Sequence, residues 1–307
     1  MIVLGDKYEF NTLELNQIKK KHNPIHISLK NKPTSTIIKE ISNLCKNSQY
    51  KIIVLNTSKN ISDELIKYLT TLEFKGIEFL TIEHFLEKYL EKVYIPRDGS
   101  NINFLDEIKP YNKFQYIIKR LIDFSITIPL GIISSPIMLY AAYRIKKESP
   151  EGPIIFKQKR VGLNGKEFVC YKFRSMIPDA EKDKPKFASK DDPRVFKWGA
   201  FMRKTRIDEL PQLWNVIKGD MHLIGPRPER KYWINIFEKN IPYYNLRHIV
   251  KPGITGWAQV YYPYGTNEED AYQKLLYDLY YIKNWSLLLE LKTIIKTIKV
   301  MFSKSGL

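Results

Sequence analysis

The sequence predicts a chain in two parts: a small α/β domain with a parallel sheet, followed by an α+β module that lies against a membrane. Three observations support this prediction. The first part alternates short apolar segments with amphipathic ones, which is typical of β-α-β units. The second part contains 20 consecutive uncharged residues, 124–143, enough to cross a bilayer as a helix. Finally, the 50 Lys and Arg residues exceed the 33 Asp and Glu residues and give a net charge of +17.

Residues 1–98 are predicted to form the α/β domain, and residues 99–112 a linker. The expected strands are 25–31, 51–58 and 76–82, and the expected helices between them are 34–47 and 61–74. Gly5 and Gly76 are the only glycines before Gly99, so the domain lacks a glycine-rich phosphate loop. We therefore interpret it as an accessory or docking domain rather than a nucleotide site.

The uncharged run has basic residues on both sides and a proline near its centre. The basic residues are Lys113, Lys119, Arg120, Arg144, Lys146 and Lys147. Because cytoplasmic segments are enriched in Lys and Arg, both ends of the helix are expected on the cytoplasmic side. Pro136, which follows Ser135, removes a backbone hydrogen bond and kinks a helix. The sequence therefore favours a re-entrant, kinked helix at about residues 116–145; an ordinary membrane-spanning helix and a buried core helix are the alternatives.

The positive charge is concentrated after residue 110. Residues 1–110 carry 16 basic and 14 acidic side chains, a balance of +2, so the rest carry 34 and 19, a balance of +15. Such an excess favours an anionic partner: phospholipid headgroups, a phosphorylated substrate or nucleic acid. The sequence contains no nucleic-acid recognition motif, which argues against the last of these. Cys45 and Cys170 are the only cysteines, so no disulfide framework is expected.

An antiparallel hairpin is predicted next in the chain. Residues 153–176 are strand-like on both sides of Asn164-Gly165, a dipeptide typical of tight hairpin turns. Lys172 and Arg174 are among the cations of this hairpin. A solvated face explains such cations, and so does a site that binds diphosphate or lipid headgroups.

An acidic pair stands out in the stretch that follows. Asp208 and Glu209 open a predicted helix that is expected to end at Gly219. Arg203 precedes the pair, and Arg227 follows the helix between two prolines. Adjacent carboxylates among fixed cations suit a site that handles phosphate and a divalent metal. The alternative is that Asp208 caps the helix and Glu209 interacts with its dipole.

Residues 113–307 resemble the bacterial sugar transferases, the monotopic polyprenyl-phosphate phosphoglycosyl transferases, in five segments that occur in the same order. The segments are KRLIDFSITIPLGIISSPIML, FKQKRVGLNGKEFVCYKFRSM, RKTRIDELPQLWNVIKGDMHLIGPRPE, RHIVKPGITGWAQV and YDLYYIKNWSLLLELKTI. Five ordered segments are far more specific than any one of them. Residues 1–98 resemble the soluble Rossmann-like domain that precedes this module in longer members. Those members begin with transmembrane helices, so we interpret this domain as a truncated one.

The resemblance implies that residues 113–307 form a catalytic module. It transfers a sugar-1-phosphate from a UDP-sugar to undecaprenyl phosphate, releases UMP and gives undecaprenyl-diphosphate-sugar, the first membrane step of surface glycan assembly. The resemblance also implies Mg²⁺, an anionic phospholipid membrane as a partner, and a monotopic location on the cytoplasmic face of the bacterial inner membrane. The sugar, the pathway (exopolysaccharide, capsule or O-antigen) and the oligomeric state do not follow from the sequence, and a homodimer stays open.

The same resemblance implies a role for each candidate residue. Asp208 is the expected nucleophile, whose ionised carboxylate attacks phosphorus and forms a covalent phosphosugar intermediate. Asp208 and Glu209 are the expected metal ligands, with assistance to proton transfer as an alternative role for Glu209. The side chains expected to bind substrate phosphate are Arg203, Arg227, Lys172 and Arg174, the last two as weaker candidates. The kink of the membrane helix is expected at Ser135 and Pro136.

Two other functions are compatible with parts of the sequence. In the first, the sugar phosphate is transferred directly, without a covalent intermediate, and Asp208 serves only as a metal ligand. In the second, the chain is a catalytically inactive membrane scaffold of a glycan assembly complex. The intact acidic pair and the arginines around it argue against the scaffold.

Overall fold

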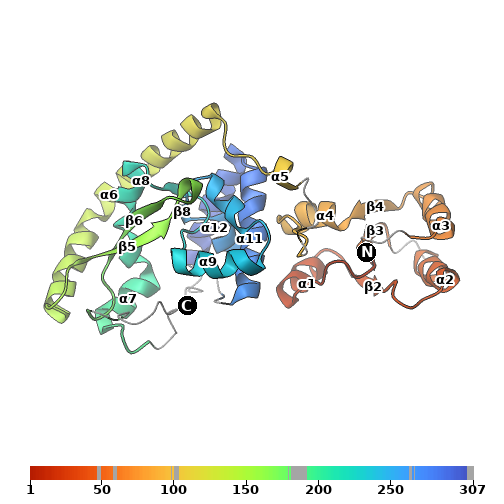
Figure 1. Ribbon diagram of the computed structural model, residues 1–307, viewed down its shortest axis with the longest axis horizontal. Coiled ribbons are helices and arrows are strands. Elements are labelled where there is room, and N and C mark those ends of the chain that lie inside the picture. Colours follow the sequence, from red (N-terminus) through yellow and green to blue (C-terminus); the bar gives the residue numbers. More distant parts are fainter. Residues whose placement is uncertain are drawn as a thin grey trace. The chain divides into compact units, whose positions relative to one another are not determined.

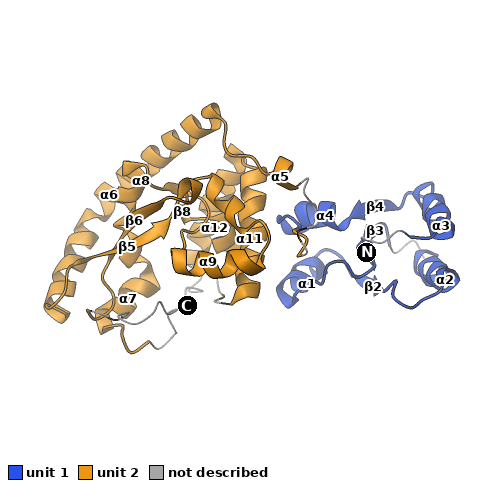
Figure 2. Cartoon of the chain, viewed as in Figure 1, with its two compact units in different colours: residues 1–94 blue, residues 95–307 orange. Residues whose placement is uncertain are grey.

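The computed structural model describes residues 1–46, 50–57, 61–97, 99, 104–178, 180, 192–262, 265 and 267–302. The chain divides into two compact units, Met1–Tyr94 and Ile95–Leu307 (Figures 1 and 2). Each unit has its own core and its own sheets, and each is described by itself below.

Unit 1 contains a parallel sheet of four strands in the order β2-β1-β3-β4. The strands are β1 (Ile2–Leu4), β2 (Ile25–Ile27), β3 (Ile52–Leu55) and β4 (Glu78–Thr81). The predicted parallel sheet is therefore confirmed. The central strand β1 was not predicted, because three residues are too few to show a periodic pattern. Ile2 pairs with Ile25 on one side and with Ile53 on the other, so β1 lies in the middle of the core.

Helices and a short π-helical turn complete the described part of unit 1. They are α1 (Thr12–Lys19), α2 (Thr34–Cys45), α3 (Asp63–Glu73), α4 (Ile82–Phe85) and the π-helix Leu86–Leu90. Local signals explain where helices begin: Asn11 and Glu14 form a capping box at α1, and the Ser62 hydroxyl accepts from the Leu65 amide at α3. The core lies between the sheet and the apolar faces of α2 and α3, with Ile41 fully buried.

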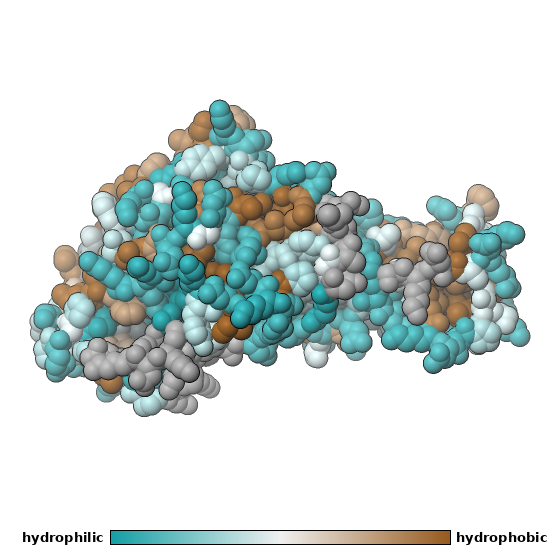
Figure 3. Space-filling model, viewed as in Figure 1, coloured by the Kyte–Doolittle hydropathy of each residue, from teal (hydrophilic) through white to brown (hydrophobic). Residues whose placement is uncertain are grey.

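A long helix, α6 (Lys113–Glu148), runs along the outer edge of unit 2 (Figure 1). Within the described ranges it is the one helix that is long and apolar enough to cross a membrane, with a mean hydropathy of 1.6 in its most apolar window. Only 17% of that window is buried, and Figure 3 shows apolar side chains along this edge. A core helix of a soluble protein would be mostly buried, so this alternative is disfavoured. The re-entrant course and the kink at Ser135 and Pro136 stay predictions.

Buried polar contacts hold the first turns of α6 against the rest of unit 2. The Lys119 ammonium, 1% exposed, contacts Glu290 Oε1 at 2.5 Å and Tyr281 Oη at 2.7 Å. One turn further along, Asp123 Oδ2 lies 2.6 Å from His222 Nδ1. These contacts join α6 to β7 (His222–Ile224) and α12 (Leu287–Phe302).

The predicted hairpin is confirmed. Strands β5 (Ile155–Val161) and β6 (Glu167–Phe173) are antiparallel, with Ile155 opposite Phe173 and Val161 opposite Glu167. The turn has Asn164 at φ 54° and Gly165 at φ 74°, the left-handed conformations that asparagine and glycine adopt most easily.

Helices and a second small sheet form the rest of unit 2. They are α5 (Phe104–Glu107), α7 (Lys197–Thr205), α8 (Gln212–Lys218), α9 (Lys231–Asn240), a 3-10 helix (Tyr244–Ile249), α10 (Trp257–Tyr261), α11 (Glu268–Lys283) and the strand β8 (Gly253–Thr255), which is parallel to β7. The sequence of residues 268–302 predicts helix with a break near Asn284, and this prediction is confirmed, because Asn284 caps the end of α11 before α12 begins at Leu287. Residues 268–302 also mix Tyr, Trp, Leu and Ile with Lys, which is typical of interfacial helices at a membrane and also of ordinary amphipathic packing. The interfacial location of these two helices stays a prediction.

Candidate active site

The acidic pair lies in a tight turn between two helices. Helix α7 ends at Arg206, whose backbone is left-handed with φ 60° and ψ 13°. The chain then makes one 3-10 turn, Ile207–Glu209, before α8 begins. The prediction that Asp208 opens the helix is therefore wrong by one turn. Pro211, the residue before α8, has no N–H to donate, so the regular helix starts after it.

Glu209 is the centre of a compact ionic cluster. Its side-chain oxygen Oε1 accepts from Lys172 Nζ at 2.9 Å and from Arg227 Nη2 at 3.2 Å. Lys172 comes from β6 and Arg227 from the loop after β7, so three separate segments meet at this carboxylate. Burial acts to raise the pKa of Glu209, but Lys172, Arg227 and Arg206 outweigh it and lower that pKa below the ordinary value. Glu209 is therefore ionised and holds the two cations in place.

Asp208 is as buried as Glu209, at 9% exposure, but its surroundings differ. Its Oδ1 atom is buried and has no hydrogen-bond partner among the residues that the structure describes. Burial raises the pKa of Asp208, and the neighbouring Glu209 charge raises it further, while nearby Lys172, Arg206 and Arg203 offset part of the rise. Burying a carboxylate oxygen without a hydrogen-bond partner lowers the stability of the fold. In this pair the Glu209 carboxylate is satisfied by two cations, whereas Asp208 Oδ1 is free to interact with a ligand.

These segments identify the chain's family. The model of the family described as Bacterial sugar transferase matches residues 114–304, which include α6, the hairpin and the acidic pair. The chain belongs to the bacterial sugar transferase family. The resemblance of residues 113–307 is thereby confirmed.

Three relatives place this bacterial sugar transferase among named proteins. It is 40% identical over 247 residues to UDP-N-acetylgalactosamine-undecaprenyl-phosphate N-acetylgalactosaminephosphotransferase of Aeromonas hydrophila, which covers 80% of this chain and 57% of that protein. It is 43% identical over 175 residues to UDP-glucose:undecaprenyl-phosphate glucose-1-phosphate transferase of Xanthomonas campestris pv. campestris, covering 56% and 36%. It is 41% identical over 193 residues to an uncharacterized sugar transferase of Bacillus subtilis (strain 168), covering 62% and 90%. The chain thus spans about half or less of the first two relatives.

The structure brings some of the predicted phosphate-binding residues of this sugar transferase together and leaves one apart. Lys172 and Arg227 contact the acidic pair directly, and half-buried Arg203, in the last turn of α7, acts on Asp208 through its charge. Arg174 does not reach the pair. Its guanidinium donates to Ser149 Oγ at 2.7 Å and to the Pro153 carbonyl at 2.7 Å. The prediction for Arg174 needs correction: this side chain ties the end of β6 to the end of α6.

Two features of the site were not assigned a role from the sequence of this transferase. The charge of Arg206 acts on both carboxylates. Its position depends on a left-handed backbone conformation, which the sequence does not predict because residues other than glycine rarely adopt it. Buried Arg247 donates to the Arg227 carbonyl at 3.0 Å and pairs with Asp278 at 2.7 Å. These two contacts hold the loop that carries Arg227 in position. Arg227, Arg247 and Asp278 are far apart in the sequence, so no local pattern predicts that they meet.

The donor set of the site fits a magnesium ion. Mg²⁺ prefers carboxylate oxygens and binds through one or two of them together with water and substrate phosphate. Asp208 Oδ1 is unpartnered and Glu209 is adjacent, so these two residues would hold the ion. No group of three or more His, Cys, Asp or Glu side chains in the described part of the chain could hold a metal by itself. Water or oxygen atoms of a bound molecule would therefore supply the remaining ligands.

Proposed function

We propose that this bacterial sugar transferase moves a sugar-1-phosphate from a UDP-sugar to undecaprenyl phosphate and releases UMP. The observation that carries the proposal is the buried carboxylate of Asp208, with its unpartnered Oδ1, beside the ionic cluster of Glu209, Lys172 and Arg227. The names of the two longer relatives describe reactions of this class on undecaprenyl phosphate. The product would be undecaprenyl-diphosphate-sugar.

Asp208 acts as the nucleophile in this proposal. One of its oxygens attacks the sugar-bearing phosphorus of the UDP-sugar, a new O–P bond forms, and the P–O bond to UMP breaks. Undecaprenyl phosphate then attacks the same phosphorus, takes the phosphosugar and restores the Asp208 carboxylate. Asp208 must therefore be ionised when it attacks, and the second step returns it to the carboxylate form without transfer of a proton to it.

The cations make this attack electrostatically feasible. An anionic carboxylate is repelled by a diphosphate unless positive charge compensates for both. Lys172 and Arg227 are held at fixed positions by Glu209 and would bind the diphosphate oxygens, and Arg203 would add a third cation. A bound Mg²⁺ supplies further charge neutralisation at the phosphate oxygens when held by Asp208 and Glu209.

The proposed location is the cytoplasmic face of the bacterial inner membrane. The acceptor phosphate of a polyprenyl lipid lies at headgroup depth, whereas a UDP-sugar is soluble, so the site must lie where both can reach it. Helix α6 exposes large apolar side chains that include Leu121, Ile132, Ile133 and Leu139. A re-entrant α6, with its basic ends at anionic headgroups, would keep the acidic pair at this depth.

Release of UMP tests the proposal. Detergent-solubilised protein is incubated with Mg²⁺, undecaprenyl phosphate and a panel of UDP-sugars. The two longer relatives are named for different sugars, so the panel includes UDP-glucose and UDP-N-acetylgalactosamine. We expect UMP release with at least one donor, dependent on the lipid acceptor beyond the first turnover. A folded protein that releases no UMP from any donor would support the scaffold alternative.

The pH dependence of the rate is expected to report the ionisation of Asp208. Because the pKa of Asp208 is raised by burial and by Glu209, the rate should fall on acidification at a higher pH than for an ordinary aspartate. Lys172 lowers the pKa of Asp208, so Lys172→Met should raise it and move the acidic limb of kcat/KM upward by about one pH unit. If Lys172→Met lowers the rate but leaves the acidic limb of kcat/KM at the same pH, Lys172 binds substrate without affecting the pKa of Asp208.

A further inference from the structure

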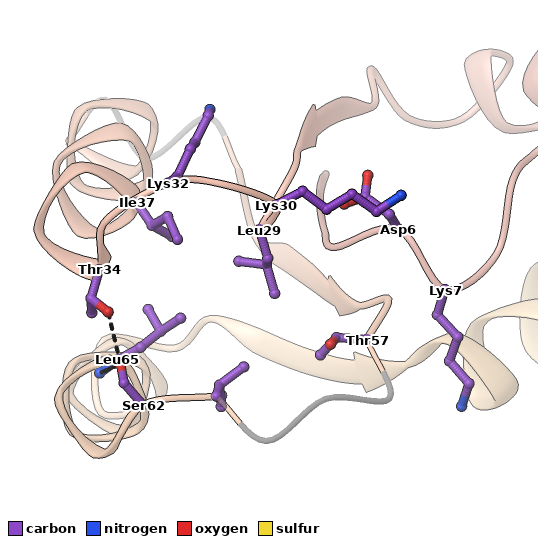
Figure 4. A pocket seen from close by; sticks show the side chains of 11 residues that line it. Asp6, Lys7, Leu29, Lys30, Lys32, Thr34, Ile37, Thr57, Ser62 and Leu65 are labelled. Carbon is purple, nitrogen blue, oxygen red and sulfur yellow. Dashed lines mark hydrogen bonds between the residues drawn. The ribbon is translucent and has the colours of Figure 1, made fainter.

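The described lining of the cavity in unit 1 does not converge on a ligand. This cavity measures about 250 Å³ and lies between the loops after β1, β2 and β3 and the first turns of α2 and α3 (Figure 4). Lys7 and Lys32 point away from it, and Lys30 points toward Asp6. The buried polar side-chain atoms that lack a partner among the described residues all belong to unit 2 instead.

One of these atoms is Nε2 of Gln212, the first residue of α8. The Gln212 side chain is almost completely buried, with the residue 3% exposed, and its amide nitrogen has no acceptor among the described residues. A buried donor without a hydrogen bond costs stability, so its presence in a folded protein needs an explanation. The unpartnered atom nearest to it in the sequence is Asp208 Oδ1.

Gln212 lies on the buried side of the segment that carries the acidic pair. From the 3-10 turn into α8 the backbone stays in the right-handed helical region, so residues about one turn apart are neighbours. Trp214 and Lys218 of this segment are exposed, whereas Asp208 and Gln212 are both buried. Gln212 therefore faces the interior of unit 2, one turn after Asp208.

Contacts on either side of Gln212 place it beside β6. Asn215, three residues later, accepts from the Tyr171 amide of this strand at 3.0 Å. Glu209, three residues earlier, accepts from Lys172 Nζ of the same strand at 2.9 Å. Gln212 therefore lies next to the end of β6 that carries Lys172, within the cluster described above.

The two unpartnered atoms are complementary, yet they do not bond to each other. Asp208 Oδ1 is an acceptor and Gln212 Nε2 is a donor, and glutamine and aspartate four residues apart can hydrogen-bond on a helix. A phosphoryl group would satisfy both atoms, because its phosphorus bonds to Oδ1 while a non-bridging oxygen accepts from Nε2. Lys172 and Arg227 already donate to Glu209, whereas the Gln212 donor is uncommitted.

We propose that Gln212 is a catalytic residue, which donates a hydrogen bond from Nε2 to a non-bridging oxygen of the phosphoryl group that Asp208 attacks. A donor held in place before the reaction stabilises the charge that develops on this oxygen in the transition state. The amide neither gains nor loses a proton. Both steps take place at the same phosphorus, so the same hydrogen bond serves each. This assignment rests on the transfer reaction proposed above.

Gln212→Met tests the assignment, because methionine has a similar length and no N–H group. Release of UMP and thermal unfolding are measured in detergent for the variant and the wild type. We expect UMP release to fall about 10²-fold, as for the loss of one transition-state donor. The Tm should stay the same or rise, because the variant removes a buried donor that has no partner in the free protein.

Asn215→Leu is the matched comparison for stability. It removes a buried amide from the same helix, but this amide is satisfied by the Tyr171 amide and the Val169 carbonyl. Its Tm should therefore fall. If Gln212→Met lowers the Tm as Asn215→Leu does, Gln212 stabilises the fold and the assignment is wrong. Wild-type rates of UMP release in Gln212→Met would also contradict it.

A binding measurement separates failure of this assignment from failure of the proposed reaction. The affinity for a UDP-sugar is measured by calorimetry in Asp208→Asn and in the double variant with Gln212→Met, neither of which needs to turn over. We expect the double variant to bind about threefold or more weakly. A wild type that releases no UMP would refute the transfer reaction, whereas equal affinity of these two variants would refute the contact with Gln212.

Discussion

Asp208→Asn is expected to lower UMP release by about 10³-fold or more, because it removes the oxygen nucleophile while keeping the shape of the side chain. The fold should survive this change. The carboxylate is buried and its Oδ1 has no partner in the described residues, so the neutral amide costs less to bury than the ion it replaces. Loss of activity without loss of stability is the expected signature of a residue kept for chemistry.

A trapping experiment separates the covalent route from direct transfer. Wild-type protein is mixed with a UDP-sugar radiolabelled in the sugar, without lipid acceptor, and quenched under denaturing conditions. We expect about one label per active chain in the wild type, none in Asp208→Asn, and release of the label when undecaprenyl phosphate is added before quenching. Glu238→Gln, which changes an exposed carboxylate on α9, is the control and should label normally. Normal turnover without any trapped label would favour direct transfer.

Local sequence signals predicted the parts of the fold that depend on neighbouring residues. Asn164-Gly165 specifies a hairpin because both residues adopt left-handed conformations at low cost. The break at Asn284 and the end of α8 at Gly219, with φ 90°, are equally local. The three-residue strand β1 has no such signal, because its place at the centre of the sheet depends on pairing with β2 and β3.

The candidate site was predicted in its chemistry but less well in its geometry. The sequence indicated Asp208, Glu209, Arg227 and Lys172 from their types and from the family resemblance, and the structure brings these four together. Arg174 lies two residues after Lys172 and would share its side of a continuing strand. However, β6 ends at Phe173, so this alternation does not extend to Arg174. Contacts between distant segments, not local pattern, decide which cations reach the pair.

Glu290→Leu is expected to lower the free energy of unfolding of unit 2 by about 3–5 kcal/mol, because it leaves the Lys119 ammonium buried without a counter-charge. Both side chains of this ion pair are nearly inaccessible to solvent, and Glu290 also accepts from Tyr281 and from Trp285 Nε1 at 2.5 Å. Thermal unfolding in detergent measures the effect. The control is Glu107→Gln, whose carboxylate pairs with Lys283 at the surface and should contribute less than about 1 kcal/mol.

The double variant Lys119→Met with Glu290→Leu decides what the ion pair does for the enzyme. Removing both charges relieves the desolvation cost of each, so the double variant should regain much of the stability that the single variant loses. If the ion pair of Lys119 and Glu290 only stabilises the fold, UMP release by the double variant should recover together with its stability. Lys119 also donates to the Ile224 carbonyl at 3.0 Å, in the strand that leads to Arg227. Recovered stability with a rate that stays low would therefore mean that α6 sets the position of Arg227, and equal recovery of both would contradict that coupling.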